Sequence, residues 1–186
     1  MIRNAFISAG SGLAVALVLG STALAQQSPS NPPPPPPQPT AAAMPYMQLA
    51  GESDVFEISS SQIAAMRSQN PDIKRYAEML IDHHTRTTNV LLAQAKAANM
   101  PPPPAVLGPQ KRAMLDQLFA ASGPALDQLY IQQQIPAHEQ ALAVHSTYAQ
   151  SGDTPQLRTA AAGAVPFVQQ HLAEARRMAG AMGGGM

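Results

Sequence analysis

Residues 70–98 read NPDIKRYAEMLIDHHTRTTNVLLAQAKAA, and this stretch decides the fold class. Asn70 is a favourable N-cap, Pro71 fits the first helical position and Asp72 puts a negative charge in the first turn, so a helix is predicted to begin here. Apolar positions then recur in steps of three and four, which is the spacing of a helix that faces a bundle core. The residues on this seam are Ile73, Ala77, Leu80, His84, Thr87 and Leu91.

Helices are also predicted on both sides of this one. An earlier helix runs from about Glu52 to Gln69, and prolines 101–104 end the central one near Ala98. A short helix runs from about Pro109 to Ala121. After a break at Ser122-Gly123-Pro124 a longer helix continues to about Gln150, and after a similar break that ends at Pro155 the last helix runs to about Met178. Because strand-type alternation is almost absent, the chain is predicted to be all-α.

A histidine occupies a core position on three of these helices. His84 lies on the seam already given. The seam of the second of these three helices consists of Ile131, Ile135, His138, Leu142 and His145. The seam of the last helix consists of Leu157, Ala161, Ala164, Val168, His171, Ala175 and Met178. An imidazole is costly to bury alone in a helix bundle, so several at one level predict a shared site.

The positions of the turns place these histidines at a common level. Glu57 and His84 are about equally far from the turn at Asn70, and His138 and His171 are about equally far from the turn near Thr154. The two turns also resemble each other, since NPDIK and TPQLR share proline, aliphatic and basic positions. The prediction is a ferritin-like antiparallel four-helix bundle, made of two hairpins joined by a long crossover that contains the short extra helix.

Several short motifs carry a family resemblance. They are Gln62-Ile-Ala, Pro71-Asp-Ile-Lys-Arg-Tyr-Ala77, Met79-Leu-Ile-Asp-His-His-Thr85, Ser122-Gly123, Asp127-Gln-Leu-Tyr130, His138-Glu139 and Val165-Pro166 with His171-Leu172. In order and spacing they resemble the bacterial family called domain of unknown function 4142, often labelled outer-membrane protein and placed with ferritin-like folds. The resemblance covers about residues 50–178 and implies that fold and an exported location. It maps the recurrent histidines of the family to His84, His138 and His171, and its glutamate to Glu57; His83 departs from the family pattern, where an acidic residue is usual.

The candidate metal site is Glu57, His84, His138 and His171, with His145 as a weaker member. Three imidazoles and one carboxylate suit a single Zn, Cu, Ni or Fe ion. A di-iron oxidase is not expected, because only one core carboxylate is predicted and two irons need bridging carboxylates. The alternative is a metal-free polar network that fixes the helix register. For His145 the alternative is a half-exposed position near the bundle end, and His83 is expected on the helix flank.

The ends of the chain read as export and linker segments. Arg3, the apolar run 13–19 and Ala23-Leu24-Ala25 predict a signal peptide over residues 1–25, which places the protein in the periplasm or outside the cell. Residues 26–50 are expected to be a disordered Pro-rich linker, which is a spacer or contacts an envelope partner. Residues 51–179 then form the bundle, and residues 180–186 a flexible Gly/Met tail. The methionines Met178, Met182 and Met186 are candidate ligands for soft Cu(I).

The composition of the chain excludes several classes of function. The chain has 186 residues and no cysteine, which excludes disulfides, zinc–thiolate sites and thiol catalysis. Lys+Arg and Asp+Glu are 11 each, so no net charge attracts nucleic acid. The chain has no G-x-S-x-G motif, Walker loop or H-E-x-x-H motif, so an enzyme ranks third among the hypotheses. No membrane span is expected after the signal peptide is removed. The leading hypothesis is an exported metal-binding or metal-responsive protein; the competing one is a metal-free envelope or stress-related interaction module.

Overall fold

The computed structural model describes residues 38–183, and these residues form five helices and no strand. The helices are α1 (Ala43–Arg67), α2 (Pro71–Ala97), α3 (Pro109–Ala120), α4 (Gly123–Ser151) and α5 (Pro155–Gly183). The all-α expectation is therefore confirmed for this part of the chain. The predicted signal peptide and residues 26–37 of the predicted Pro-rich linker lie outside the described residues.

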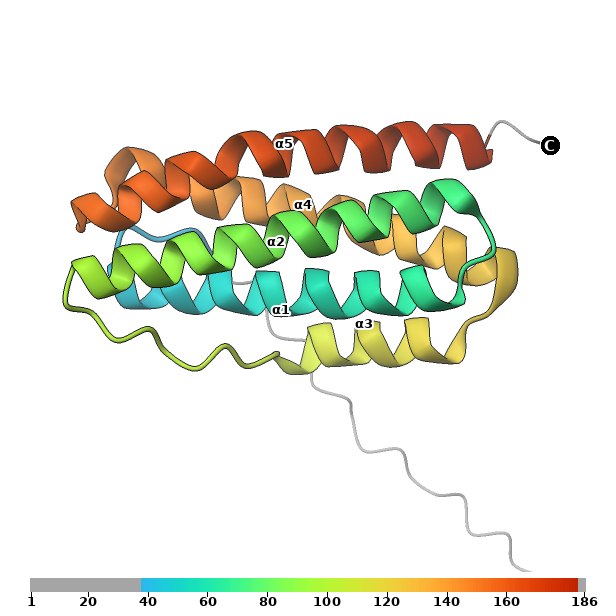
Figure 1. Ribbon diagram of the computed structural model, residues 1–186, viewed down its shortest axis with the longest axis horizontal. Coiled ribbons are helices and arrows are strands. Elements are labelled where there is room, and N and C mark those ends of the chain that lie inside the picture. Colours follow the sequence, from blue (N-terminus) through green and yellow to red (C-terminus); the bar gives the residue numbers. More distant parts are fainter. Residues whose placement is uncertain (1–37, 184–186) are drawn as a thin grey trace, which may run out of the picture. The chain divides into compact units, whose positions relative to one another are not determined.

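The four long helices pack side by side (Figure 1). α1 packs against α2 and α4, and α5 packs against the same two helices, so α2 and α4 lie across the bundle from each other. Residues 98–108 and α3 carry the chain back along the outside of α1, and α2 and α4 consequently run in the same direction. The chain does not simply run up and down between neighbouring helices. No helix among residues 38–183 is long and apolar enough to cross a membrane.

Local signals set both ends of α2. The Asn70 side chain accepts a hydrogen bond from the backbone N–H of Asp72 at 2.9 Å, as an N-cap does. At the other end Asn99 adopts a left-handed conformation with φ of 54°. The N–H groups of Asn99 and Met100 then donate to the carbonyls of Lys96 and Ala95, which is the Schellman arrangement that closes a helix.

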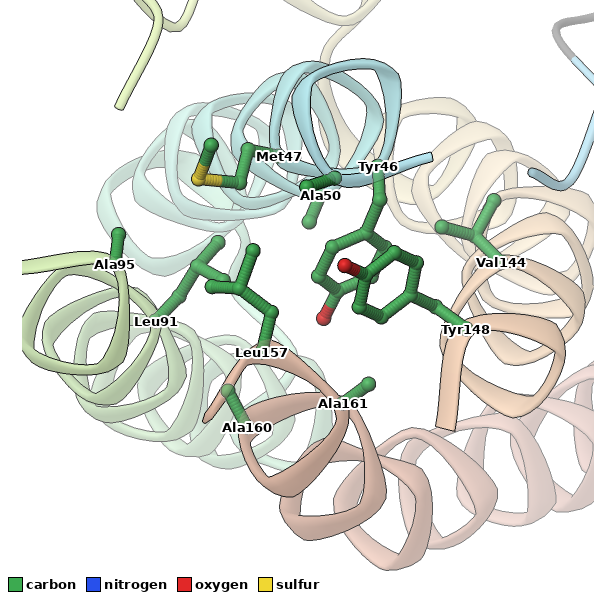
Figure 2. Close-up of a cluster of buried hydrophobic side chains, with 11 residues drawn as sticks. Tyr46, Met47, Ala50, Leu91, Ala95, Val144, Tyr148, Leu157, Ala160 and Ala161 are labelled. Atoms are coloured by element: carbon green, nitrogen blue, oxygen red, sulfur yellow. The ribbon is translucent and has the colours of Figure 1, made fainter. Parts of the chain in front are cut away.

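The start of α1 differs from the sequence prediction. The helix begins at Ala43 rather than near Glu52, so the bundle takes in residues assigned to the linker. A long-range contact explains this start, because Asp153 in the turn between α4 and α5 accepts a hydrogen bond from the N–H of Ala43 at 3.2 Å. Tyr46 also stacks on Tyr148 with ring centroids 3.9 Å apart (Figure 2). Neither contact leaves a signal in the local sequence.

The last helix also continues beyond its predicted end. α5 runs to Gly183, through residues for which a flexible tail was expected from Gly180. Met178 is buried in the core and Met182 packs against it, so these two methionines extend the packed face of the helix. Their thioethers serve core packing, and the third tail methionine lies outside the described residues.

Two apolar clusters occupy the two halves of the bundle. The first consists of Ala43, Tyr46, Met47, Ala50, Leu91, Ala95, Val144, Tyr148, Leu157, Ala160 and Ala161 (Figure 2). The second consists of Ala64, Ile73, Tyr76, Ala77, Leu80, Leu118, Leu126, Tyr130, Ile131, Ala175 and Met178. Every long helix carries at least one buried polar residue between the two clusters. We call Asp54, Glu57, His84, His138 and His171 the polar layer.

Candidate metal centre

Three histidines meet in the middle of the polar layer. His84 comes from α2, His138 from α4 and His171 from α5, and their exposed fractions are 3%, 0% and 1%. One ring nitrogen from each can be chosen so that all three lie within 4.8 Å of one another. The ring centroids are 5.1 Å apart for His84 and His171, 5.2 Å for His138 and His171, and 5.6 Å for His84 and His138. The structure thus brings together the three histidines that the seam and turn positions put at one level.

Each of these rings has one nitrogen held by a neighbour. Nδ1 of His138 donates to the carbonyl oxygen of Gln134 at 2.9 Å, and Nδ1 of His84 lies 2.8 Å from Oδ1 of Asp54. Nε2 of His171 lies 2.9 Å from Nδ1 of His83. Such contacts fix the orientation of a ligating imidazole and decide which nitrogen carries the proton.

The second nitrogen of each ring has no hydrogen-bond partner among residues 38–183. These atoms are Nε2 of His84, Nε2 of His138 and Nδ1 of His171, and all three are buried. Since a carbonyl oxygen only accepts, the Nδ1 of His138 carries the hydrogen and its Nε2 bears a lone pair. Buried polar atoms are nearly always paired, and this group of unpaired nitrogens could hold a metal ion.

Asp54 is a site residue that the sequence prediction missed. It is 5% exposed, and its Oδ2 accepts a hydrogen bond from the Thr88 hydroxyl at 2.6 Å while its Oδ1 holds His84. The prediction of a single core carboxylate was therefore wrong. Asp54 precedes Glu57 by three positions on α1, and this helical spacing was the available signal for a shared face.

Glu57 lies beside the three histidines without joining their close group. Its side chain is fully buried, and neither carboxylate oxygen has a hydrogen-bond partner in the described part of the chain. Oε1 lies 3.8 Å from Nδ1 of His138, which is too long for a hydrogen bond. The structure thus brings Glu57 into the polar layer, on the side of His138 that faces its Gln134 contact.

The protonation of the cluster follows from its surroundings. Burial lowers the pKa of His138 despite the opposing charge of Glu57. Burial, together with the neighbouring histidines, lowers the pKa of His171 to about 2. Burial also opposes charge on His84, but the hydrogen bond and charge of Asp54 outweigh it and raise the pKa of that ring. At neutral pH His138 and His171 are therefore neutral, as metal ligands must be.

His145 does not belong to this group. It was expected either as an outer ligand or as a half-exposed residue, but it is buried and its Nδ1 lies 3.1 Å from the Tyr46 hydroxyl. This hydrogen bond places it against the first apolar cluster. Burial lowers the pKa of His145 to about 4, so it is a neutral core histidine with its own partner.

His83 contacts the histidine cluster, which the sequence did not indicate. It was expected on the helix flank, and it is half-buried there, with its ring tilted against Phe167 at a centroid distance of 4.8 Å. Its bond to His171 was not foreseen. The side-chain rotations that bring the two rings together are not encoded in helical spacing.

The fold and the site define an all-helical bundle whose middle layer carries a buried histidine cluster with the spacing of metal ligands. The chain belongs to the family Domain of unknown function (DUF4142), whose model matches residues 28–178. A solved structure of CopM in the Cu(II)-bound form is similar, with a TM-score of 0.62 and 16% sequence identity over 74% of this chain and 95% of that one. At this identity the likeness shows a shared fold. A comparison with curated proteins gives no match.

Proposed function

We propose that this protein binds one transition-metal ion in the buried histidine cluster and serves as an exported metal-binding or metal-responsive protein. The observation that carries the proposal is the set of three unpaired, buried ring nitrogens on His84, His138 and His171. Each of these rings is oriented by a partner on its other nitrogen, which is the arrangement found around ligating imidazoles.

The charges of the polar layer support the same proposal. Asp54 and Glu57 are buried carboxylates, and an uncompensated buried charge is strongly destabilising. Lys111 lies nearby over the Phe56 ring, but burial lowers its pKa and no ion pair joins it to either carboxylate within the described residues. A divalent cation held by the three histidines would place positive charge in the same layer as these two carboxylates.

The ligand set favours some metals over others. Imidazole suits Cu, Zn, Ni and Fe, and the similarity to CopM in its Cu(II)-bound form makes copper the first ion to test. A di-iron centre is not supported, although two carboxylates are now available. Asp54 is engaged by His84 and Thr88, which leaves Glu57 alone to bridge two ions.

The proposal is tested by loading the chelator-treated protein with Cu(II) or Zn(II) and measuring bound metal after dialysis. The wild type is expected to retain one ion per chain, and His138→Ala is expected to lose tight binding while keeping its helical circular dichroism. His145→Ala is the matched control, since it removes a buried histidine outside the cluster and is expected to retain the ion. Equal retention by His138→Ala and the wild type would refute the proposal.

A metal-free envelope or stress-related interaction module is the second candidate. It is favoured by the hydrogen bonds that cross the core without any ion, such as Gln134 to Ser60 at 3.1 Å and Ser61 to Tyr130 at 2.8 Å. These contacts would fix the register of α1 against α4. Elemental analysis of protein isolated from its native host separates the two candidates, because the module would carry no stoichiometric metal.

The ferritin-like plan and the export of the protein complete the proposal. The packing of α1 on α2 and of α4 on α5, with a crossover between the two pairs, supports the two-hairpin plan. Export to the periplasm or the exterior rests on the Ala23-Leu24-Ala25 motif, and the Pro-rich segment after it is the candidate contact to an envelope partner. The mass of the exported protein should correspond to a chain that starts at Gln26; retention of Met1 would contradict this.

A further inference from the structure

The three unpaired nitrogens lie in a closed core, yet one side chain connects them to the surface. His84, His138 and His171 are almost completely buried, whereas His83 is half-buried and bonded directly to His171. We propose that His83 is a receiving ligand, which captures a metal ion at the seam between α2 and α5 and passes it inward through His171. This inference rests on the proposed metal binding of the cluster.

The geometry of His171 suits such a transfer. Its Nε2 lies 2.9 Å from His83, while its Nδ1 is the unpaired nitrogen of the buried cluster. The rings of His83 and His171 lie within 18° of parallel, with centroids 5.2 Å apart. One imidazole therefore presents a nitrogen to the outer seam and another to the core. When an ion binds between the two rings, the ring that donated the shared hydrogen changes to its other neutral tautomer by proton exchange with solvent, so that both facing nitrogens offer a lone pair. When the ion exchanges onto Nδ1 of His171, that nitrogen gives up its proton to solvent and Nε2 takes one back.

A second soft donor lies on the same seam. Met79 is one helical turn before His83 on α2, so the two side chains share a face of the helix. The Met79 thioether is half-buried and accepts a weak hydrogen bond from the Gln170 amide at 3.9 Å. Gln170 immediately precedes His171 on α5. Thioether and imidazole together suit soft and borderline metal ions better than Mg²⁺ or Ca²⁺.

Solvent reaches this seam through a groove. An open groove between α2 and α5 is lined by residues that include Met79, Tyr76 and Gln170. The rim of the groove carries both signs of charge, with Asp72 and Glu174 beside Arg75 and Arg177. These mixed charges would let an ion approach without binding it strongly. On α2 the lining residues extend as far as Met79, one turn before His83.

The test follows the rates of metal loading and release by stopped-flow quenching of tyrosine fluorescence, since the chain has four tyrosines and no tryptophan. His83→Gln keeps an amide that can hydrogen-bond to His171 but removes the metal-binding imidazole. We expect it to slow Cu(II) loading about tenfold, and to slow release to an excess of chelator as well, because the same route serves both directions. Loading as fast as in the wild type would overturn the inference.

The rate of metal release shows whether His83 is a receiving ligand or only supports the orientation of His171. Loss of a support would speed release and leave loading unchanged, and that outcome would also overturn the inference. Met79→Leu, which keeps the side-chain volume, is expected to slow the loading of Ag(I) more than that of Zn(II). Met66→Leu, at an exposed methionine of α1, is its control. If the wild type binds no metal at all, the proposed function fails first, and the two failures are thereby distinguished.

Discussion

At the scale of single residues, the cluster depends on side chains that do not face it directly. Asp54 holds His84 and is held in turn by Thr88, so the carboxylate fixes the ring orientation and leaves Nε2 toward the cluster. Carboxylate–histidine pairs of this kind raise the basicity of the ligating nitrogen. We therefore expect Asp54 to affect metal affinity, although it is not itself a member of the close group of ligand atoms.

Replacing Asp54 with Asn is predicted to weaken metal affinity by about 10- to 100-fold, because the amide keeps the size of the side chain but loses its charge. The affinity is measured by competition with a chelator of known affinity. Asp82→Asn is the matched control, since Asp82 lies on the surface of α2 in an ion pair with Arg86. An affinity for Asp54→Asn equal to that of the control would show that Asp54 is only structural.

The sequence predicted which three histidines lie close together for a clear physical reason. A helix fixes which side chains share a face, so seam spacing located His84, His138 and His171, and turn distances set their level. It did not fix side-chain rotation or the identity of hydrogen-bond partners. Asp54 was therefore missed, the contact of His83 with His171 was not foreseen, and His145 was assigned neither to its buried position nor to its Tyr46 partner.

At the scale of the helices, a start set by a local cap was predicted from the sequence, whereas a start set by a long-range contact was not. The cap at Asn70 is local, and α2 begins where the sequence predicts. The first residues of α1 have no local cap, because Ala42 offers no side chain to accept a hydrogen bond. Asp153, in the turn between α4 and α5, supplies that acceptor instead. It also accepts a hydrogen bond from the Tyr148 hydroxyl at 2.9 Å.

Asp153→Ala is predicted to lower the free energy of unfolding by about 1 kcal/mol, the usual cost of losing an N-cap carboxylate. Urea denaturation monitored by circular dichroism measures this change. Glu78→Ala, an exposed position on α2, is the control and should stay within about 0.5 kcal/mol of the wild type. If the two variants were equally stable, the start of α1 would be held by its apolar contacts alone.

At the scale of the whole molecule, buried neutral histidines make the stability depend on pH. Burial lowers the pKa of His145 from 6.5 to about 4. Between pH 6.5 and pH 4 the unfolded chain therefore binds a proton at His145 that the folded chain does not bind. The contribution of His145 to the free energy of unfolding is therefore fully present above pH 6.5 and is lost as the pH falls toward 4. His84, whose pKa is raised, acts in the opposite direction: its contribution is present below the unfolded pKa and is lost as the pH rises through the folded one.

His145→Gln in metal-free protein is predicted to lose less stability than the wild type between pH 6.5 and 4, because the titrating ring is gone. The difference is on the order of 3 kcal/mol, from about 1.4 kcal/mol for each unit of pKa shift. Urea midpoints measured across this range in the presence of a chelator give the two profiles. Parallel profiles would mean that His145 becomes protonated without unfolding the chain.

The polar layer separates two apolar clusters, and this arrangement makes a bound ion a link between the halves of the bundle. An ion held by His84, His138 and His171 would tie α2, α4 and α5 together between the two clusters. Metal at about 100 times its dissociation constant should raise the free energy of unfolding by about 2.7 kcal/mol. Since each long helix contributes to both clusters, we expect amide hydrogen exchange to slow in both, around Leu91 and around Leu80 alike. His138→Ala should abolish the effect in both halves. Protection confined to one cluster would show that the ion stabilises its own neighbourhood and does not couple the two ends.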